Sequence, residues 1–197
     1  HYKLDKPEEV PFARPTSSFA LTSQLHTATP ENLQQAQVKA TDEPADLIED
    51  FSTDWQDWYR LSADNPHHWQ YWTRKICDPK WRGTTGNKLA LEVRSDQPNE
   101  LVIMLTENFF RSYRGRQQEY LALVPLAGGD DWQSVTLSPS DFTTPDKQQP
   151  LESWQQVDLL GLRAFYQQRG SEKIFGSNRW QGPQPRFRNM RWEGDND

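Results

Sequence analysis

Flat aromatic rings and planar hydrogen-bonding groups alternate in residues 69–74, which read Trp-Gln-Tyr-Trp-Thr-Arg. A pyranose ring presents C–H patches that pack on aromatic faces, while its hydroxyls pair with planar groups such as guanidinium, amide and carboxylate. In a strand, positions two apart share one face, so these residues offer both kinds of group on each face. Similar side chains recur at Trp81, Arg82, Asn108, Phe109, Phe110, Tyr113, Arg114, Tyr120, Arg163 and Tyr166.

Burial in a core is the alternative explanation for each ring taken singly, because a strand buries every second residue. The set as a whole favours exposed rings, since nine Trp are more than one small sandwich needs inside. Arg163 interrupts the apolar residues 159–165, and an Arg there needs a partner, either a structural carboxylate or a ligand. The predicted ligand contacts are Trp69, Trp72, Arg74, Trp81, Tyr120 and Arg163. We expect Trp72 and Arg74 to share an exposed strand face with Arg163 or Tyr120.

Groups that could catalyse a reaction are few. The chain has four histidines, all within its first 68 residues, and lacks the His-Glu-x-x-His, Gly-x-Ser-x-Gly and phosphate-loop motifs. Carboxylate pairs such as Glu92 and Glu107 are of the kind that glycosidases use. Both lie in predicted strands whose apolar residues already define a core, so a structural role is favoured. We therefore assign no catalytic residue.

Charge and cysteine content exclude several classes of protein. The 22 Lys and Arg against 28 Asp and Glu give a net charge of −6, which disfavours non-specific binding to nucleic acid. Cys77 is the single cysteine, so neither a disulfide framework nor a cysteine-based zinc cluster is expected. No segment approaches the roughly 20 apolar residues that span a bilayer. The chain begins at His1; a cleaved signal peptide would explain this, as would a cloning or proteolytic boundary.

Period-two alternation of apolar and polar residues dominates the middle of the chain and predicts antiparallel β structure. The predicted strands cover residues 47–51, 55–61, 68–77, 89–94, 101–106, 119–126, 132–137, 157–166 and 187–192. Residues 101–106 are almost continuously apolar, as in a strand covered on both faces. Trp132 opens its strand and is predicted to lie in the core. The turn spacing is typical of a sandwich or barrel.

Two segments lack this alternation. Residues 1–46 contain five prolines and scattered Ser, Thr and Gln, so they predict an irregular arm or linker preceding a β-sandwich domain at 47–197. Residues 167–185, which are rich in Gly and Pro, predict a long loop.

Three stretches carry a resemblance to a known family. They are Ile48-Glu49-Asp50-Phe51, then Trp132-Gln133-x-Val135-x-Leu137 leading to Asp141-Phe142, and then Trp154-x-x-Val157-x-x-Leu160-x-Leu162. In this order they resemble the galactose-binding-like jelly rolls, modules appended to secreted glycoside hydrolases and polysaccharide lyases. An intracellular respiratory-complex-assembly family with a related jelly roll has a similar pattern. The resemblance covers residues 47–192 and implies a jelly-roll β-sandwich with a sugar-binding face, although the insertion at 167–185 departs from the pattern.

The resemblance also implies a structural Ca²⁺, which such modules often bind through carboxylate and carbonyl oxygens. Candidate ligands are Glu49, Asp50, Asp141 and Glu193. The alternative is that these four residues are ordinary surface acids.

The function that these observations favour is non-catalytic binding of polysaccharide or oligosaccharide. The resemblance implies a secreted or periplasmic module or accessory protein, linked to or associated with a glycan-degrading enzyme. One alternative is a polysaccharide-active enzyme, either a lyase or a glycoside hydrolase. The other is a protein–protein interaction domain that uses its exposed aromatic rings.

Overall fold

The computed structural model describes residues 46–52, 57–61, 67, 69–164, 166–167, 174–175 and 179–194. The predicted arm lies outside these ranges except for Asp46. Within them the regular elements are β-strands and short 3-10 turns, which confirms the predicted all-β class. None of these elements is a helix long and apolar enough to cross a membrane.

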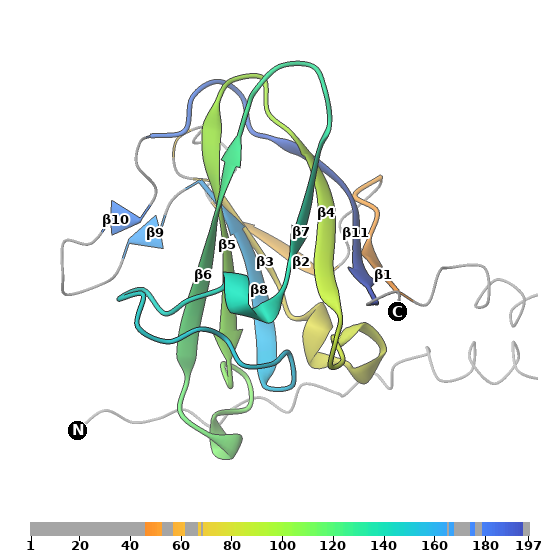
Figure 1. The fold of residues 1–197 in the computed structure, drawn as a ribbon, viewed down its shortest axis with the longest axis vertical. Helices are drawn as coiled ribbons and strands as arrows, with labels where there is room; N and C mark the ends of the chain where they lie inside the picture. Colours follow the sequence, from red (N-terminus) through yellow and green to blue (C-terminus); the bar gives the residue numbers. More distant parts are fainter. Residues whose placement is uncertain are drawn as a thin grey trace, which may run out of the picture. The chain divides into compact units, whose positions relative to one another are not determined.

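Two antiparallel sheets form the domain (Figure 1). The first, sheet A, contains in spatial order β1 (Leu47–Glu49), β11 (Arg186–Glu193), β4 (Lys88–Arg94) and β7 (Gln133–Leu137). The second, sheet B, contains β2 (Trp58–Leu61), β3 (Gln70–Thr73), β8 (Val157–Arg163), β5 (Asn99–Glu107) and β6 (Gln118–Leu126). A separate two-stranded pair joins β9 (Tyr166–Gln167) to β10 (Ile174–Phe175).

The order of the strands along the chain makes this sandwich a jelly roll. Apart from β2, β9 and β10, the described residues contain eight strands, which pass repeatedly from one sheet to the other. Counted along the chain, these eight stand in the order first, eighth, third, sixth in sheet A. In sheet B the order is second, seventh, fourth, fifth. Two Greek keys wound in this way are the jelly-roll arrangement, as the sequence predicts.

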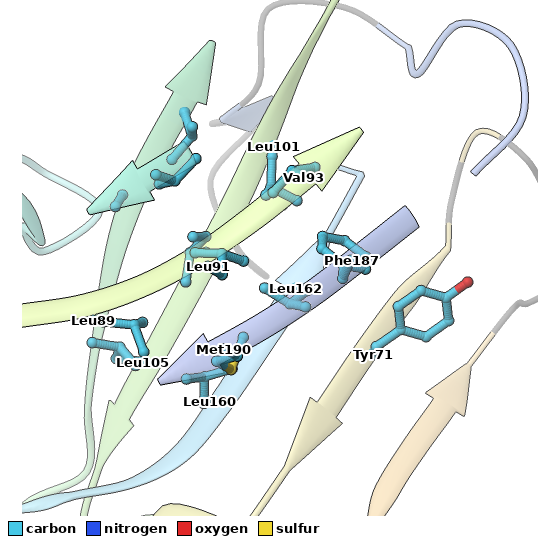
Figure 2. Packing of buried hydrophobic residues seen from close by; sticks show 14 of the residues in the cluster. Tyr71, Leu89, Leu91, Val93, Leu101, Leu105, Leu160, Leu162, Phe187 and Met190 are labelled. Atoms are coloured by element: carbon cyan, nitrogen blue, oxygen red, sulfur yellow. The ribbon is translucent and has the colours of Figure 1, made fainter. Parts of the chain in front are cut away.

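The core lies between the two sheets and is filled by alternate residues of each strand (Figure 2). From sheet A it contains Leu89, Leu91, Val93, Phe187 and Met190. From sheet B it contains Tyr71, Leu101, Leu105, Leu160 and Leu162. Two pairs of tryptophans extend this core. Trp69 packs edge-on against Trp180 and Trp154 packs against Trp192, with ring centres 4.9 Å apart in each pair. These four large rings are therefore part of the core, which is the alternative explanation that the sequence allows for each ring taken singly.

Several predicted strands are longer than the observed ones, among them those at 68–77 and 157–166. β3 ends at Thr73 because Arg74 leaves the extended conformation and begins the 3-10 turn η1 (Lys75–Cys77). A second turn, η2 (Pro79–Trp81), follows directly and is capped by Asp78, whose Oδ1 accepts a hydrogen bond from Lys80 N at 2.9 Å. β8 ends at Arg163, so Tyr166 belongs to the short strand β9. The long loop predicted at 167–185 contains β10, and part of it lies outside the described residues.

The prediction that Trp132 lies in the core is wrong. Its ring is half-buried on the outer side of sheet A. Alternation places Trp132 on the same face as the exposed Ser134 and Thr136, opposite the buried Val135. The Arg188 guanidinium covers this ring, with Cζ 4.2 Å from the ring centre, and also pairs with Glu92. A surface cation, and not the core, therefore shelters Trp132.

Candidate functional site

The outer face of sheet B carries one continuous row of side chains across all five strands. The pairing registers place these residues side by side in the order Tyr59, Trp72, Gly161, Met104 and Leu121. Alternation puts the row on the face opposite the core residues of the same strands. An apolar cluster therefore lies outside the sandwich as well as inside it, and Trp72 packs against this outer cluster.

Accessible aromatic surface in this row is confined to the β2 edge. Tyr59 and Trp72 stack face to face with ring centres 4.1 Å apart and planes 14° from parallel. Tyr59 is 48% exposed and Trp72 is half-buried, whereas Met104 and Leu121 are buried. A stacked pair whose outer ring is open to solvent is a flat platform on which another ring can pack.

Planar polar groups border this platform on the same face. The adjacent row contains Gln70 and Arg163, which are direct partners across β3 and β8. Both are partly exposed. Arg163 Nε lies 3.5 Å from the position that a Cβ on Gly161 would occupy, so the guanidinium group extends over the gap beside Trp72 that glycine leaves. Sheet B thus places an amide and a guanidinium next to an aromatic pair.

Trp69 and Tyr120 lie on the opposite face of the sheet from Trp72. Trp69 is completely buried, with its ring stacked on Tyr71 at 5.2 Å. Tyr120 is buried on the inner side of β6. Of the two partners that we expected to share the face of Trp72, the structure supplies Arg163 and not Tyr120.

Arg74 and Trp81 lie beyond the end of β3. Arg74 is exposed, but it stands outside the strand, so the alternation that links it to Trp72 in the sequence does not apply. Trp81 is half-buried in η2 between two lysines, with Lys80 Nζ at 4.5 Å and Lys75 Nζ at 5.7 Å from its ring centre. Since Lys75 also binds Glu49 of β1, Trp81 belongs to the β1 side of the domain.

The four carboxylates proposed as calcium ligands each have protein partners. Glu49 accepts from Lys75 Nζ at 2.5 Å and from Trp58 Nε1 at 3.1 Å. Asp50 binds Ser52 through its backbone N–H and its hydroxyl, and these hydrogen bonds lower the Asp50 pKa. Asp141 caps the 3-10 turn η4 (Pro139–Asp141), and Glu193 pairs with Arg191. The described residues contain no group of three or more His, Cys, Asp or Glu side chains placed to hold a metal.

An acid and a phenol meet inside the sandwich near the end of β5. The Tyr120 hydroxyl donates to Glu107 Oε2 at 3.2 Å. Burial raises the pKa of Glu107, the Tyr120 hydrogen bond opposes this shift, and the charges of Glu152 and Asp158 add to it. Burial, followed by the charge and hydrogen bond of Glu107, raises the pKa of Tyr120 to about 12. At neutral pH Tyr120 is therefore a proton donor to Glu107 and not a base.

A hollow of about 590 Å³ opens at the loop end of sheet B. Its lining residues are Pro98, Asn99, Glu100, Pro125, Leu126, Arg179, Trp180 and Gln181. Asn99 and Gln181 bind each other at 2.8 and 2.9 Å, and Trp180 is buried with its Nε1 donating to Pro183 O. Polar and apolar groups line the hollow in similar measure, and among the described residues it offers no exposed ring for stacking.

Sequence reasoning missed Tyr59, the most accessible ring of the platform. The signal was present, because residues 58–61 read Trp-Tyr-Arg-Leu and alternation places Tyr59 opposite Trp58. Only the pairing of β2 with β3 shows that Tyr59 meets Trp72.

Comparison with known proteins finds similarity at the level of the fold. No family model and no curated protein matches this chain. Among solved structures, it is similar to the family 11 carbohydrate-binding module of the Clostridium thermocellum cellulosomal cellulase Lic26A-Cel5E, with a TM-score of 0.41 and 13% identity over 64% of this chain and 67% of that one. The family 11 module from Clostridium thermocellum in complex with a β-1,3-1,4-mixed-linked tetrasaccharide has a TM-score of 0.47 and 11% identity over 76% and 95%.

An agarase, AgWH50C, is similar with a TM-score of 0.43 and 12% identity over 76% of this chain, which spans 26% of that protein. Identities of 11–13% concern the fold, which the order of the strands already establishes as a jelly roll.

Proposed function

We propose that this jelly-roll domain binds carbohydrate without cleaving it, through the β2–β3 edge of the outer face of sheet B. The observation that carries the proposal is the Tyr59–Trp72 stack, open on its Tyr59 side, with Gln70 and Arg163 on the same face. A sugar ring packs its C–H patches on a flat apolar surface and pairs its hydroxyls with planar hydrogen-bonding groups, and this face offers both together.

The polar groups beside the stack favour binding over catalysis. An amide and a guanidinium donate hydrogen bonds to hydroxyl oxygens, and neither exchanges a proton near neutral pH. The acid with a raised pKa, Glu107, lies with Tyr120 on the inner face of the sheet, away from this surface. We therefore assign the face a binding role.

The length of glycan that the face contacts follows from its exposure. Met104 and Leu121 in the same row are buried, so among the described residues the proposed contacts are Tyr59, Trp72, Gln70 and Arg163. Neighbouring strands stand about 4.8 Å apart, so these side chains span roughly 10 Å across three strands. We propose a short contact with one or two sugar residues, whether of an oligosaccharide or of a polysaccharide chain.

We also propose the wider setting that the sequence resemblance implies. The domain would work in the secreted or periplasmic space, beside a linked or associated glycan-degrading enzyme, and calcium would be a structural ligand at most. A polysaccharide-active enzyme and a protein-binding domain are the alternatives, and both are outcomes of the experiment below.

The experiment is affinity electrophoresis on a panel of soluble polysaccharides, with Tyr59→Ala as the first variant. Tyr59 is about half exposed, so its removal should leave the thermal midpoint close to the original. We expect retention to fall about tenfold or more, because a stacking contact of about 1–1.5 kcal/mol is lost together with its buried area. Trp72→Phe should weaken retention less, since it keeps a ring at this position.

Trp132→Ala is the matched control, because it removes a half-buried ring from the outer side of the other sheet. Unchanged retention in Tyr59→Ala and Trp72→Phe would move the binding site elsewhere. Release of reducing ends or unsaturated sugars would support an enzyme. Failure of every glycan to bind the original protein would contradict the proposal and leave the protein-binding alternative.

A further inference from the structure

Most of the exposed large hydrophobic side chains gather on one loop. Among the described residues four such side chains are exposed: Tyr59 and, in the connection between β5 and β6, Phe109 at 42%, Phe110 at 40% and Tyr113 at 79%. Figure 1 shows this connection below β5 and β6, where it includes the 3-10 turn η3 (Ser112–Arg114). Three exposed rings within five residues form an aromatic surface remote in sequence from the Tyr59–Trp72 stack.

A buried carboxylate fixes the shape of this loop. Asp158 is the extra residue of a β-bulge in β8, opposite the end of β5. Its Oδ1 accepts from Phe109 N at 2.8 Å, and its Oδ2 accepts from Phe110 N at 3.0 Å and Arg111 N at 3.1 Å. Arg111 Nε reaches the same Oδ2 at 3.3 Å. Because three successive amides bind one carboxylate, the rings are displayed from a preorganised backbone.

The two ends of the loop are also joined. Asn108 adopts a left-handed conformation with φ 55° and donates from Nδ2 to Gln156 Oε1 at 3.1 Å. The same amide reaches the backbone oxygen of Arg116 at 3.4 Å. The loop is therefore a closed unit that presents its side chains outward.

The loop is basic on an acidic chain. Residues 108–118 contain three Arg and no acid, whereas the whole chain has a net charge of −6. Asp158 neutralises Arg111, which leaves Arg114 and Arg116 exposed. Two further acids flank the loop: Glu119 on β6, and Glu107 on β5, whose carboxylate accepts from the Tyr120 hydroxyl on the inner face of the sheet.

We infer that the β5–β6 loop is a second glycan contact, which selects polysaccharides that carry carboxylate or sulfate groups. The inference rests on the proposed function for the class of ligand, but it uses different side chains. Tyr113 supplies a stacking face, while Arg114, whose Cζ lies 5.7 Å from the Tyr113 ring centre, and Arg116 supply donors for an anionic group.

The arrangement of the rings favours a glycan over a lipid surface. Phe109 and Phe110 pack edge-to-face at 4.8 Å and each hides more than half of its surface. The ring that projects furthest is Tyr113, a phenol flanked by Ser112 and Arg114. A membrane-inserting tip would place its purely apolar rings outermost, whereas a hydrated ligand suits a ring surrounded by donors.

The test measures retention of the full chain on polygalacturonate, alginate and a sulfated galactan, with methyl-esterified polygalacturonate as the neutral counterpart. The original protein should retain at least one acidic polymer more strongly than the esterified one. The double variant Arg114→Gln/Arg116→Gln should lose about tenfold affinity for that polymer and little for the neutral one, because each exposed charge pair contributes modestly at low salt. An ionic strength of about 0.3 M should erase the difference.

Arg179→Gln/Arg186→Gln is the matched control, since it makes the same change of charge at two exposed arginines outside the loop. Tyr113→Ala should weaken binding to acidic polymers in the same way as the arginine pair. Equal loss in the control variant, or equal binding of acidic and neutral polymers, would overturn the inference and leave the Tyr59 site untouched. Tyr113-dependent binding to vesicles of phosphatidylglycerol and phosphatidylcholine without glycan binding would replace it with a membrane role. Failure of every glycan to bind would overturn both proposals.

Discussion

Asp158 holds Arg111 through both its backbone and its side chain: one carboxylate oxygen accepts from Arg111 N at 3.1 Å and from Arg111 Nε at 3.3 Å. Asp158 is fully buried, and Arg111 is almost so. Arg111 Nη2 also donates to Val157 O at 3.1 Å, so the guanidinium binds two successive residues at the bulge of β8. The pair therefore joins a strand of the core to the loop that displays Phe109, Phe110 and Tyr113.

Asp158→Ala should be one of the most damaging substitutions in the domain. It removes the acceptor of three backbone N–H groups and leaves the Arg111 charge buried without compensation, so we expect about 3–5 kcal/mol of lost stability in urea unfolding. Amides 109–111 should also exchange hydrogen much faster. Asp141→Ala, which removes an exposed turn cap, should cost about 1 kcal/mol. Similar losses in the two variants would show that Asp158 is not a buried anchor.

The stability contributed by Glu107 should depend on pH with a definite sign. Burial holds its folded pKa above the ordinary value of 4.5, so the folded chain binds more protons than the unfolded chain between 4.5 and the raised pKa. Stability from this group is therefore full below pH 4.5 and is lost as pH rises through that interval. Glu107→Gln keeps an acceptor for Tyr120 and removes the titration.

In urea unfolding measured from pH 4 to pH 8, the midpoint of Glu107→Gln should rise relative to that of the original protein as pH rises. Asp50 has the opposite sign, because hydrogen bonds from Ser52 lower its pKa below the ordinary 3.8. Its contribution to stability is present above pH 3.8 and disappears as pH falls through the lowered pKa. The free energy of unfolding of Asp50→Asn should therefore lie furthest below that of the original protein at neutral pH. A constant difference across pH for Glu107→Gln would contradict a raised pKa.

Two tryptophans that look alike in the sequence should differ in their cost of removal. Trp154 is buried, with Nε1 donating to Asn87 O at 2.8 Å, so Trp154→Ala should cost about 3–5 kcal/mol. Trp132 lies under Arg188 on the outer side of sheet A, so Trp132→Ala should cost only about 1 kcal/mol. Thermal melts of both variants decide this, and a large loss for Trp132→Ala would return that ring to the core.

Much of sheet B could be predicted from the sequence, because long strands carry their own signal. The buried run 101–106 is apolar on both faces, and both of its faces are covered by clusters. β3 is harder, since Tyr71 and Trp72 place a ring on each face. Alternation tells which residues share a face but not which face turns inward, so the sequence leaves Trp69 as a ligand candidate, whereas the structure buries it completely.

Other misses depend on residues far away along the chain. The fate of Trp132 is decided by Arg188 on β11. The end of β3, in contrast, is set locally by η1, where Lys75 N donates to Thr73 Oγ1 at 3.1 Å, although residues 74–77 continue a plausible alternation. The aromatic platform requires the β2–β3 pairing, which no local pattern specifies.

Gly83 should tolerate no side chain. A Cβ there would lie 2.8 Å from Trp154 Cγ and 2.9 Å from Trp192 Cη2, which is too close for real atoms. We expect Gly83→Ala to cost about 1–3 kcal/mol through forced repacking of the two rings. Gly161→Ala is the control, because its Cβ would meet neighbours at 3.5–3.6 Å, an ordinary contact distance. Equal melting temperatures for the two variants would show that the rings move aside freely.

The domain boundary near residue 46 stays a prediction with a direct test. Asp46 O accepts from Trp192 N at 2.8 Å, so a truncated chain must retain Asp46. We expect a chain that starts at Ala45 to melt cooperatively within a few degrees of the full chain, and limited proteolysis to cut just before Asp46. A truncated chain that fails to fold would make residues 1–44 part of the folding unit.

The pairing of Leu121 with Thr143 protects an edge of the molecule. β6 is the outermost strand of sheet B, and open strand edges recruit strands of other molecules. Leu121 N donates to Thr143 O at 2.7 Å and Thr143 N donates to Leu121 O at 3.0 Å, while Pro125 in the same strand has no N–H to offer. Because the chain interrupts the middle of this edge with its own backbone, a second copy finds no continuous row of free N–H and C=O groups along β6, and ordered aggregation through this edge is disfavoured.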